Sequence, residues 1–175
     1  QAAMLLEEGS RRGLDDDELA LTLADYLLQK GERAKAVEVM GERLKRTPSL
    51  VKKWAPLFTD FSFSRAEIDL LLSDSVDDWI AYGEYLHKMG DAGEAGHYFG
   101  TAQFLIEGAE EVKPQWFDRL VRYYQQNGRP PQALLLLRQA VEALPDYAPF
   151  HVQLGDYYRT EGITFRAREE YQRAL

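Results

Sequence analysis

Residues 147–175, YAPFHVQLGDYYRTEGITFRAREEYQRAL, contain the pattern that decides the fold of this chain. Between positions 151 and 158 the large and small packing residues recur at the spacing of one helix face, and Gly162 then interrupts the helix. Ala167 and Tyr171 lie one turn apart on a second helix, where they can face back toward the first. The stretch therefore predicts an antiparallel pair of helices.

The same spacing occurs four times along the chain. A packing residue stands eleven positions before a glycine, and an alanine stands five positions after it. The four sets are Ala20, Gly31 and Ala36; Trp79, Gly90 and Ala95; Phe117, Gly128 and Ala133; and His151, Gly162 and Ala167. Such a period is typical of an array built from one repeated supersecondary unit.

The order of residues in these sets resembles the tetratricopeptide repeat (TPR), whose pattern is W-x2-L-G-x2-Y, then A-x3-F, then P. The residues that carry the resemblance are His151-x2-Leu154-Gly155-x2-Tyr158 with Ala167-x3-Tyr171, and Trp79-x2-Tyr82-Gly83-x2-Leu86 with Ala95-x3-Phe99. The resemblance implies an all-α fold, an α-α superhelix in which antiparallel helix pairs form a right-handed solenoid.

The intervals between the glycines predict the organisation of a single array over residues 1–175. Gly31 and Gly90 are 59 residues apart, which leaves room for an irregular, shortened unit, and the interval from Gly90 to Gly128 is 38, which indicates a lengthened loop. The predicted segments are the end of a preceding repeat at 1–13, a repeat at 17–50, the shortened repeat at 51–75, a repeat with a lengthened loop at 76–113, a repeat at 114–147 and a truncated repeat at 148–175.

Two local signals refine the shortened unit. Ser64 to Glu67 has the spacing of a capping box before an apolar run. Pro56 is expected early in a helix or at a kink. Phe61 and Phe63 have two interpretations, simple packing or exposure of one ring as an anchor for a partner.

Composition restricts the kinds of partner. The formal net charge of -8 and a pI near 5.0 disfavour nucleic acid, because contacts to phosphates need clustered Lys and Arg. The chain has no cysteine, which excludes disulfides and thiolate zinc sites. No apolar run is longer than Ala133 to Leu137, which is too short to cross a bilayer, so this segment is not expected to span a membrane.

No motif predicts catalysis, a metal or a cofactor. None of the three histidines, His87, His97 and His151, has a metal-ligand spacing, and His151 occupies a packing position of the repeat. The acidic run 15–18 stands at the start of a predicted helix, where carboxylates favour the helix dipole more readily than they bind calcium. The chain is therefore predicted to be no enzyme.

The resemblance implies that the first helix of each pair lines a concave groove that binds a protein or peptide segment. The residues predicted for this groove are Arg119, Arg122, Gln126, Arg159, Glu84 and His87. Some TPR proteins hold a peptide's terminal carboxylate with Lys, Asn and Arg on these faces. Here only Arg119 and Arg122 match, so that specificity is not carried over.

The favoured function is a non-catalytic protein–protein interaction scaffold whose partner is another protein or another part of the parent chain. The shortened unit is followed by Trp79-x2-Tyr82-Gly83-x2-Leu86 and later by LGDYYR at 154–159, an order that also resembles arrays following O-antigen ligase or polymerase-type proteins. The alternative is therefore the soluble tail of a bacterial membrane enzyme of surface-polysaccharide assembly. That alternative implies attachment to a bacterial inner-membrane protein. Both ends look cut from a longer protein, so self-association through the terminal repeats is also expected.

Overall fold

The computed structural model describes residues 16–47, 50–72 and 74–175. The segment 1–13, predicted to end a preceding repeat, lies outside these residues. Within them the chain forms ten helices and no strand. The described residues divide into two compact units, one ending at Leu105 and the other beginning at Ile106.

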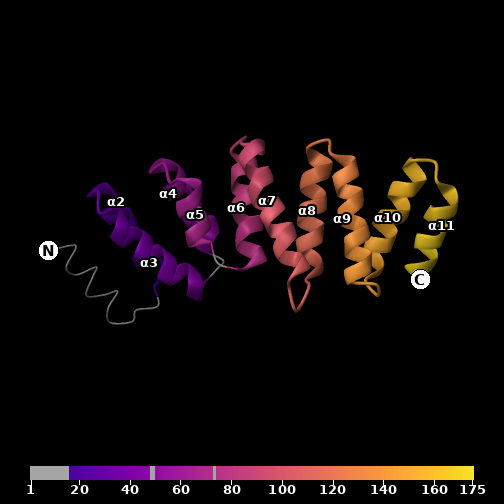
Figure 1. Ribbon diagram of the computed structural model, residues 1–175, viewed down its shortest axis with the longest axis horizontal. Coiled ribbons are helices and arrows are strands. Elements are labelled where there is room, and N and C mark those ends of the chain that lie inside the picture. Colours follow the sequence, from indigo (N-terminus) through magenta and orange to yellow (C-terminus); the bar gives the residue numbers. More distant parts are fainter. Residues whose placement is uncertain (1–15, 48–49, 73) are drawn as a thin grey trace. The chain divides into compact units, whose positions relative to one another are not determined.

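The first unit contains three antiparallel helix pairs, which Figure 1 shows as successive hairpins. The pairs are α2 (Asp17–Gln29) with α3 (Arg33–Arg46), α4 (Val51–Asp60) with α5 (Arg65–Leu71), and α6 (Val76–Lys88) with α7 (Ala92–Glu107), whose last turn extends into the second unit. The second unit contains α8 (Pro114–Gln126) with α9 (Pro130–Ala143), and α10 (Ala148–Thr160) with α11 (Thr164–Arg173).

One turn geometry ends the first helix in four of these pairs. Gly31, Gly90, Gly128 and Gly162 all have positive φ, between 64° and 89°. The residue after each glycine donates its N–H to a carbonyl five positions earlier, as Glu32 does to Leu27 at 2.9 Å. This is the Schellman arrangement, which satisfies the last carbonyls of the helix and reverses the chain. Glycine recurs because side chains rarely adopt this backbone conformation.

The α4–α5 pair uses the same turn without glycine. Ser62 has a φ of 49°, and the N–H of Phe63 donates to the carbonyl of Phe58 at 2.8 Å. The shortened unit is thus built as the others are, around a serine in the left-handed region. The helices α4 and α5 have 10 and 7 residues, against 13 to 16 in α2, α3 and α6 to α9.

Small residues on the first helices allow the second helices to approach closely. A methyl group added at Gly155 would lie 2.6 Å from the Tyr171 ring, and one at Gly83 would lie 3.0 Å from the Phe99 ring. Both distances are shorter than van der Waals contact allows. The aromatic ring therefore occupies the space that the missing side chain leaves, as the repeat pattern predicts.

Helix starts agree with the local sequence signals. The carboxylate of Asp16 accepts from the N–H groups of Glu18 and Leu19 at 2.9 and 3.2 Å, so the acidic run caps α2. Ser64 and Glu67 form the predicted capping box at the start of α5. Pro56 lies inside α4, at its sixth residue.

One arginine joins the first pair to the second. Arg33 donates from Nε to Glu67 Oε1 at 2.6 Å and from Nη1 to the carbonyl of Phe61 at 2.8 Å. Its guanidinium also lies over the ring of Phe63, 4.2 Å from the centroid. Phe63 is buried and Phe61 is partly buried, so neither ring is a fully exposed anchor.

We predict that Ser62→Gly stabilises the chain by about 1 kcal/mol, because glycine adopts the left-handed conformation without the steric cost that serine bears. Urea unfolding followed by circular dichroism measures the change. The reverse substitution at an equivalent turn, Gly31→Ser, is the matched control and should destabilise by a similar amount. Equal stability of Ser62→Gly and the parent chain would contradict this account of the turn.

The Arg33–Glu67 contact gives a second prediction, on acid stability. Hydrogen bonds from Arg33, and then from Ser64, lower the pKa of Glu67 from 4.5 to about 2. A carboxylate with a lowered pKa stabilises the fold above its ordinary pKa, and this stabilisation is lost as pH falls toward 2. Glu67→Gln should therefore cost about 1 kcal/mol at neutral pH, a figure reduced for solvent screening, and less as the solution is acidified.

Urea unfolding of both proteins across this pH range measures the difference in unfolding free energy. Glu38→Gln changes an exposed carboxylate on α3 and serves as the control. A difference between Glu67→Gln and the parent chain that stays constant from neutral to acid pH would contradict the prediction.

Candidate functional site

The predicted binding residues of the second unit lie on two first helices. Arg119, Arg122 and Gln126 are spaced three and four residues apart on α8, so they share one side of that helix. Arg159 lies near the end of α10. The amide of Gln153 on α10 donates to Asp118 on α8 at 3.2 Å, so the two helices meet at this side. We call the side formed by residues 118, 119, 122 and 126 of α8 and 153, 156 and 159 of α10 the α8/α10 face.

This face carries an excess of positive charge. Asp156 accepts from Arg159 at 3.1 Å and from the hydroxyl of Tyr171 at 2.8 Å, so its carboxylate is already engaged. Arg122 is exposed, and no carboxylate among the described residues lies within ion-pair distance of it. Arg119 is partly buried, and Gln126 is exposed. The face can therefore attract an acidic segment.

The two predicted residues of the first unit have a different setting. Glu84 and His87 lie on α6 and are both partly buried. Glu84 pairs with Lys52 of the neighbouring α4 at 3.6 Å. The hydroxyl groups of Thr59 and Tyr85 also lie 3.3 Å apart between these helices. The carboxylate predicted to face a partner is thus partly neutralised within the unit.

A buried pair of polar residues holds α10 against α11. His151 and Glu170 are both buried, and Nδ1 of the ring lies 2.7 Å from Oε2 of the carboxylate. The other ring nitrogen, Nε2, lies 2.9 Å from the carbonyl of Pro145, which can only accept, so Nε2 carries a proton. One further proton is shared between Nδ1 and Glu170. Arg173 donates to the second oxygen of Glu170 at 3.0 Å.

The equivalent positions of other pairs hold apolar residues. His151 and Glu170 are 19 residues apart, as are Trp79 and Tyr98 on α6 and α7, whose ring centroids lie 5.7 Å apart. Sequence analysis identified His151 as a packing position but missed its partner. The signal that could have identified this partner is Glu170 itself, an acidic residue at the position where the other repeats have Val39, Tyr98 and Leu136.

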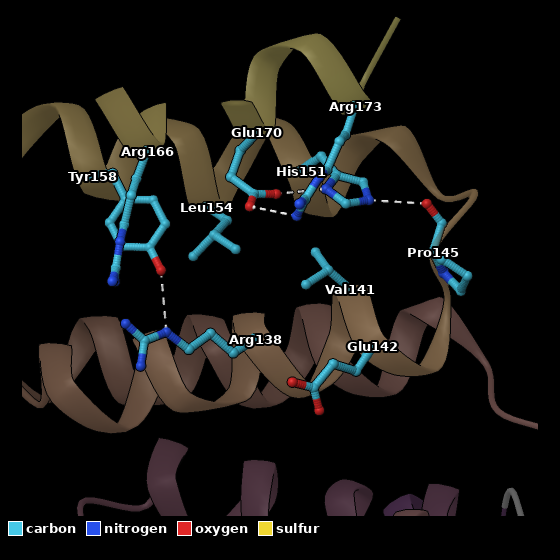
Figure 2. Close-up of a pocket in the computed structure, with 10 residues that line it drawn as sticks. All are labelled: Arg138, Val141, Glu142, Pro145, His151, Leu154, Tyr158, Arg166, Glu170 and Arg173. Carbon is cyan, nitrogen blue, oxygen red and sulfur yellow. Dashed lines mark hydrogen bonds and ion pairs between the residues drawn. The ribbon is translucent and has the colours of Figure 1, made fainter. Parts of the chain in front are cut away.

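A cleft of about 520 Å³ opens beside this pair, between α9 and α11, with α10 as its floor (Figure 2). Three arginines and two glutamates line it together with apolar residues, which sequence analysis did not single out as a site. The lining residues are Arg138, Val141, Glu142, Pro145, His151, Leu154, Tyr158, Arg166, Glu170 and Arg173. We call it the α9/α11 cleft.

The titratable groups near these sites have the following settings. Across residues 16–47, 50–72 and 74–175, no three His, Asp or Glu side chains are grouped to hold a metal ion. Both ring nitrogens of His151 are engaged in hydrogen bonds. Burial raises the pKa of Tyr82 to about 12, so this phenol stays protonated at neutral pH. In the same described ranges, no helix has the length and apolar character needed to cross a bilayer.

Comparisons with known proteins agree with this architecture. A stretch of 79 residues, 43% of the chain, is 35% identical to human interferon-induced protein with tetratricopeptide repeats 2 and covers 16% of that protein. The crystal structure of MamA matches 87% of the chain and 92% of its own length with a TM-score of 0.50 at 17% identity. The fold is TPR-like.

A second solved structure also matches most of the chain. This is the crystal structure of YrrB, which is described as a TPR protein with an unusual peptide-binding site. The match covers 98% of this chain and 91% of YrrB, with a TM-score of 0.49 at 16% identity. No protein-family model matches the chain. The predicted fold class, all-α with TPR-type antiparallel helix pairs, is confirmed.

The buried pair gives a prediction on stability. Replacing Glu170 alone by Leu, or His151 alone by Phe, should cost about 3 kcal/mol, because each leaves a buried polar group without its partner. The double variant reproduces the Phe117 and Leu136 found at the equivalent positions of α8 and α9. It should recover at least half of the combined loss.

A double-mutant cycle of urea unfolding measures this coupling. Arg173→Gln serves as a control, because it removes only the more exposed ion pair, between Arg173 and Glu170. It should lower the unfolding free energy by less than about 1 kcal/mol. Additive losses in the double variant would show that His151 and Glu170 do not stabilise one another.

Proposed function

We propose that this chain is a non-catalytic protein–protein interaction scaffold that binds a segment of a partner protein, or of its own parent chain, along its first helices. The observation that carries the proposal is the α8/α10 face, where Arg119, Arg122 and Gln126 stand beside α10 on a packed helical support. TPR-type proteins typically mediate protein–protein interaction, which supports the same function.

The charge of the face suggests the chemistry of the partner. Asp118 accepts a hydrogen bond from Gln153, and Asp156 accepts hydrogen bonds from Arg159 and Tyr171. Among the described residues, by contrast, Arg122 has no carboxylate within ion-pair distance. A segment with acidic side chains would complement this arrangement. Because packed helices hold the face, little conformational entropy is lost from the scaffold when a segment binds.

Glu84 and His87 are proposed as contacts of the first unit, with a smaller electrostatic role because Lys52 already pairs with Glu84. Two observations support a non-catalytic role for the proposed scaffold. His151 is engaged within the fold, and the phenol of Tyr82 is held protonated. The alternative function in bacterial surface-polysaccharide assembly, and self-association through terminal repeats, stay predictions.

We predict that Arg119→Glu combined with Arg122→Glu weakens binding of an acidic partner about tenfold or more, since both cations that favour it become repulsive. Affinity capture with this chain supplies the partner, and calorimetric titration measures the dissociation constant. The matched control, Arg46→Glu with Arg168→Glu, changes two exposed arginines on second helices and should alter affinity by less than about threefold.

Thermal unfolding of the variant with Arg119→Glu and Arg122→Glu should show a loss of less than about 1 kcal/mol, because Arg122 is exposed and Arg119 is only partly buried, and contacts of such arginines are weak. If the unmodified chain and the variant with Arg119→Glu and Arg122→Glu bind with equal affinity, the α8/α10 face has no part in the proposed function.

A further inference from the structure

The α9/α11 cleft is separate from the α8/α10 face. Its walls come from the second helices of two successive pairs, and its floor comes from the inward side of α10. None of Arg119, Arg122, Gln126 and Arg159 lines it. A volume of about 520 Å³ lies within the range of pockets that bind small ligands or a few side chains of a peptide.

Two arginines converge at one end of the cleft. Arg138 on α9 donates from Nε to the hydroxyl of Tyr158 at 3.2 Å, and its guanidinium lies 5.9 Å from the centre of that ring. The guanidinium of Arg166 on α11 lies 5.6 Å from the same centre. Figure 2 shows Arg166 beside the Tyr158 ring and Arg138 reaching toward it from the opposite wall.

Neither arginine has an anionic partner. Within the part of the chain that the structure describes, no carboxylate lies within 4.0 Å of Arg138 or Arg166. The first unit differs here, because Arg33 pairs with Glu67 between α3 and α5, and Arg65 pairs with Glu94 between α5 and α7. Two like charges that share a ring and a cleft repel one another, and an anion bound between them would relieve this repulsion.

The rest of the cleft restricts the ligand. Glu170 is already engaged by His151 and Arg173. Glu142 lies one helical turn beyond Arg138, and among the described residues no cation lies within ion-pair distance of it. Val141 and Leu154 lie between the two ends. A polyanion such as a nucleic-acid strand would meet the Glu142 carboxylate, whereas a segment with one acidic and one basic side chain would satisfy both ends.

We propose that the α9/α11 cleft is a second peptide-binding site, which takes an extended segment with an acidic side chain between Arg138 and Arg166 and a basic side chain at Glu142. One helical turn advances about 5.4 Å, and an extended chain advances about 3.3 Å per residue. The acidic and basic side chains are therefore about two residues apart, where both point to the same side of the segment. Guanidinium groups favour carboxylates because they can donate two parallel hydrogen bonds.

The experiment uses heptapeptides that are acetylated and amidated, so that the side chain supplies the sole carboxylate. In the peptides Asp and Lys stand one, two or three residues apart, and a fourth peptide has Asn in place of Asp. Binding to the ¹⁵N-labelled chain is followed by NMR at the Nε–H signals of arginine and at backbone signals of α9 and α11. The peptide with two-residue spacing should bind with a Kd of about 1 mM or below. The Asn peptide should bind at least about fivefold more weakly.

Variants assign the site. Arg138→Glu with Arg166→Glu should weaken binding at least about tenfold, and Arg168→Glu, on another side of α11, should change it less than about twofold. Arg119→Glu with Arg122→Glu should leave it unchanged, which separates this site from the proposed function. Far-ultraviolet circular dichroism checks that each variant is folded.

Three results would overturn the proposal: no shift of cleft signals with any peptide, equal loss in Arg168→Glu, or loss in the Arg119 and Arg122 variant in place of the cleft variant. Equal binding of the Asp and Asn peptides would also overturn it, because the carboxylate would then have no role.

Discussion

The left-handed turn at the end of each first helix is the constraint on which the rest of each pair depends. A single residue with positive φ, followed by an N–H that bonds five residues back, reverses the chain within a few positions. This geometry sets the second helix against the small residues of the first, where the rings of Phe99 and Tyr171 fill the space above Gly83 and Gly155. The surfaces proposed for binding follow from these contacts, because the contacts fix which sides of each helix remain outside.

Much of the fold could be predicted because the turn and its packing require particular residue types at fixed spacings. The four glycines, the buried side of α10 and the capping box at Ser64 are all of this kind. The turn at Ser62 could not be recognised, since serine rarely adopts positive φ and nothing local indicates that it does so here. The contribution of Arg33 depends on a contact 34 residues away, and no pattern within one helix reports it.

The candidate sites were less predictable than the helices. The residues of the α8/α10 face could be named because the TPR resemblance implies which side of a first helix lines the groove. Which carboxylates on that face are already engaged depends on neighbours such as Gln153 and Tyr171, and the sequence does not show these contacts. The α9/α11 cleft is formed by side chains that reach across from different helices. Ion pairs at such crossings contribute little stability when they are exposed. Arg138 and Arg166 are both exposed, so water screens the repulsion between them and its cost to the fold is modest. The proposed cleft site is therefore compatible with a stable fold.

The His151–Glu170 pair also has a consequence for the history of the sequence. At the equivalent positions of α6 and α7 two aromatic rings make the same helix–helix contact. Each solution is stable as a pair, but a change at one position alone leaves a buried polar group without its partner. The two positions are therefore expected to change together among related sequences, although 19 residues separate them. Covariation of these two positions would show that the contact between α10 and α11 is kept as a unit.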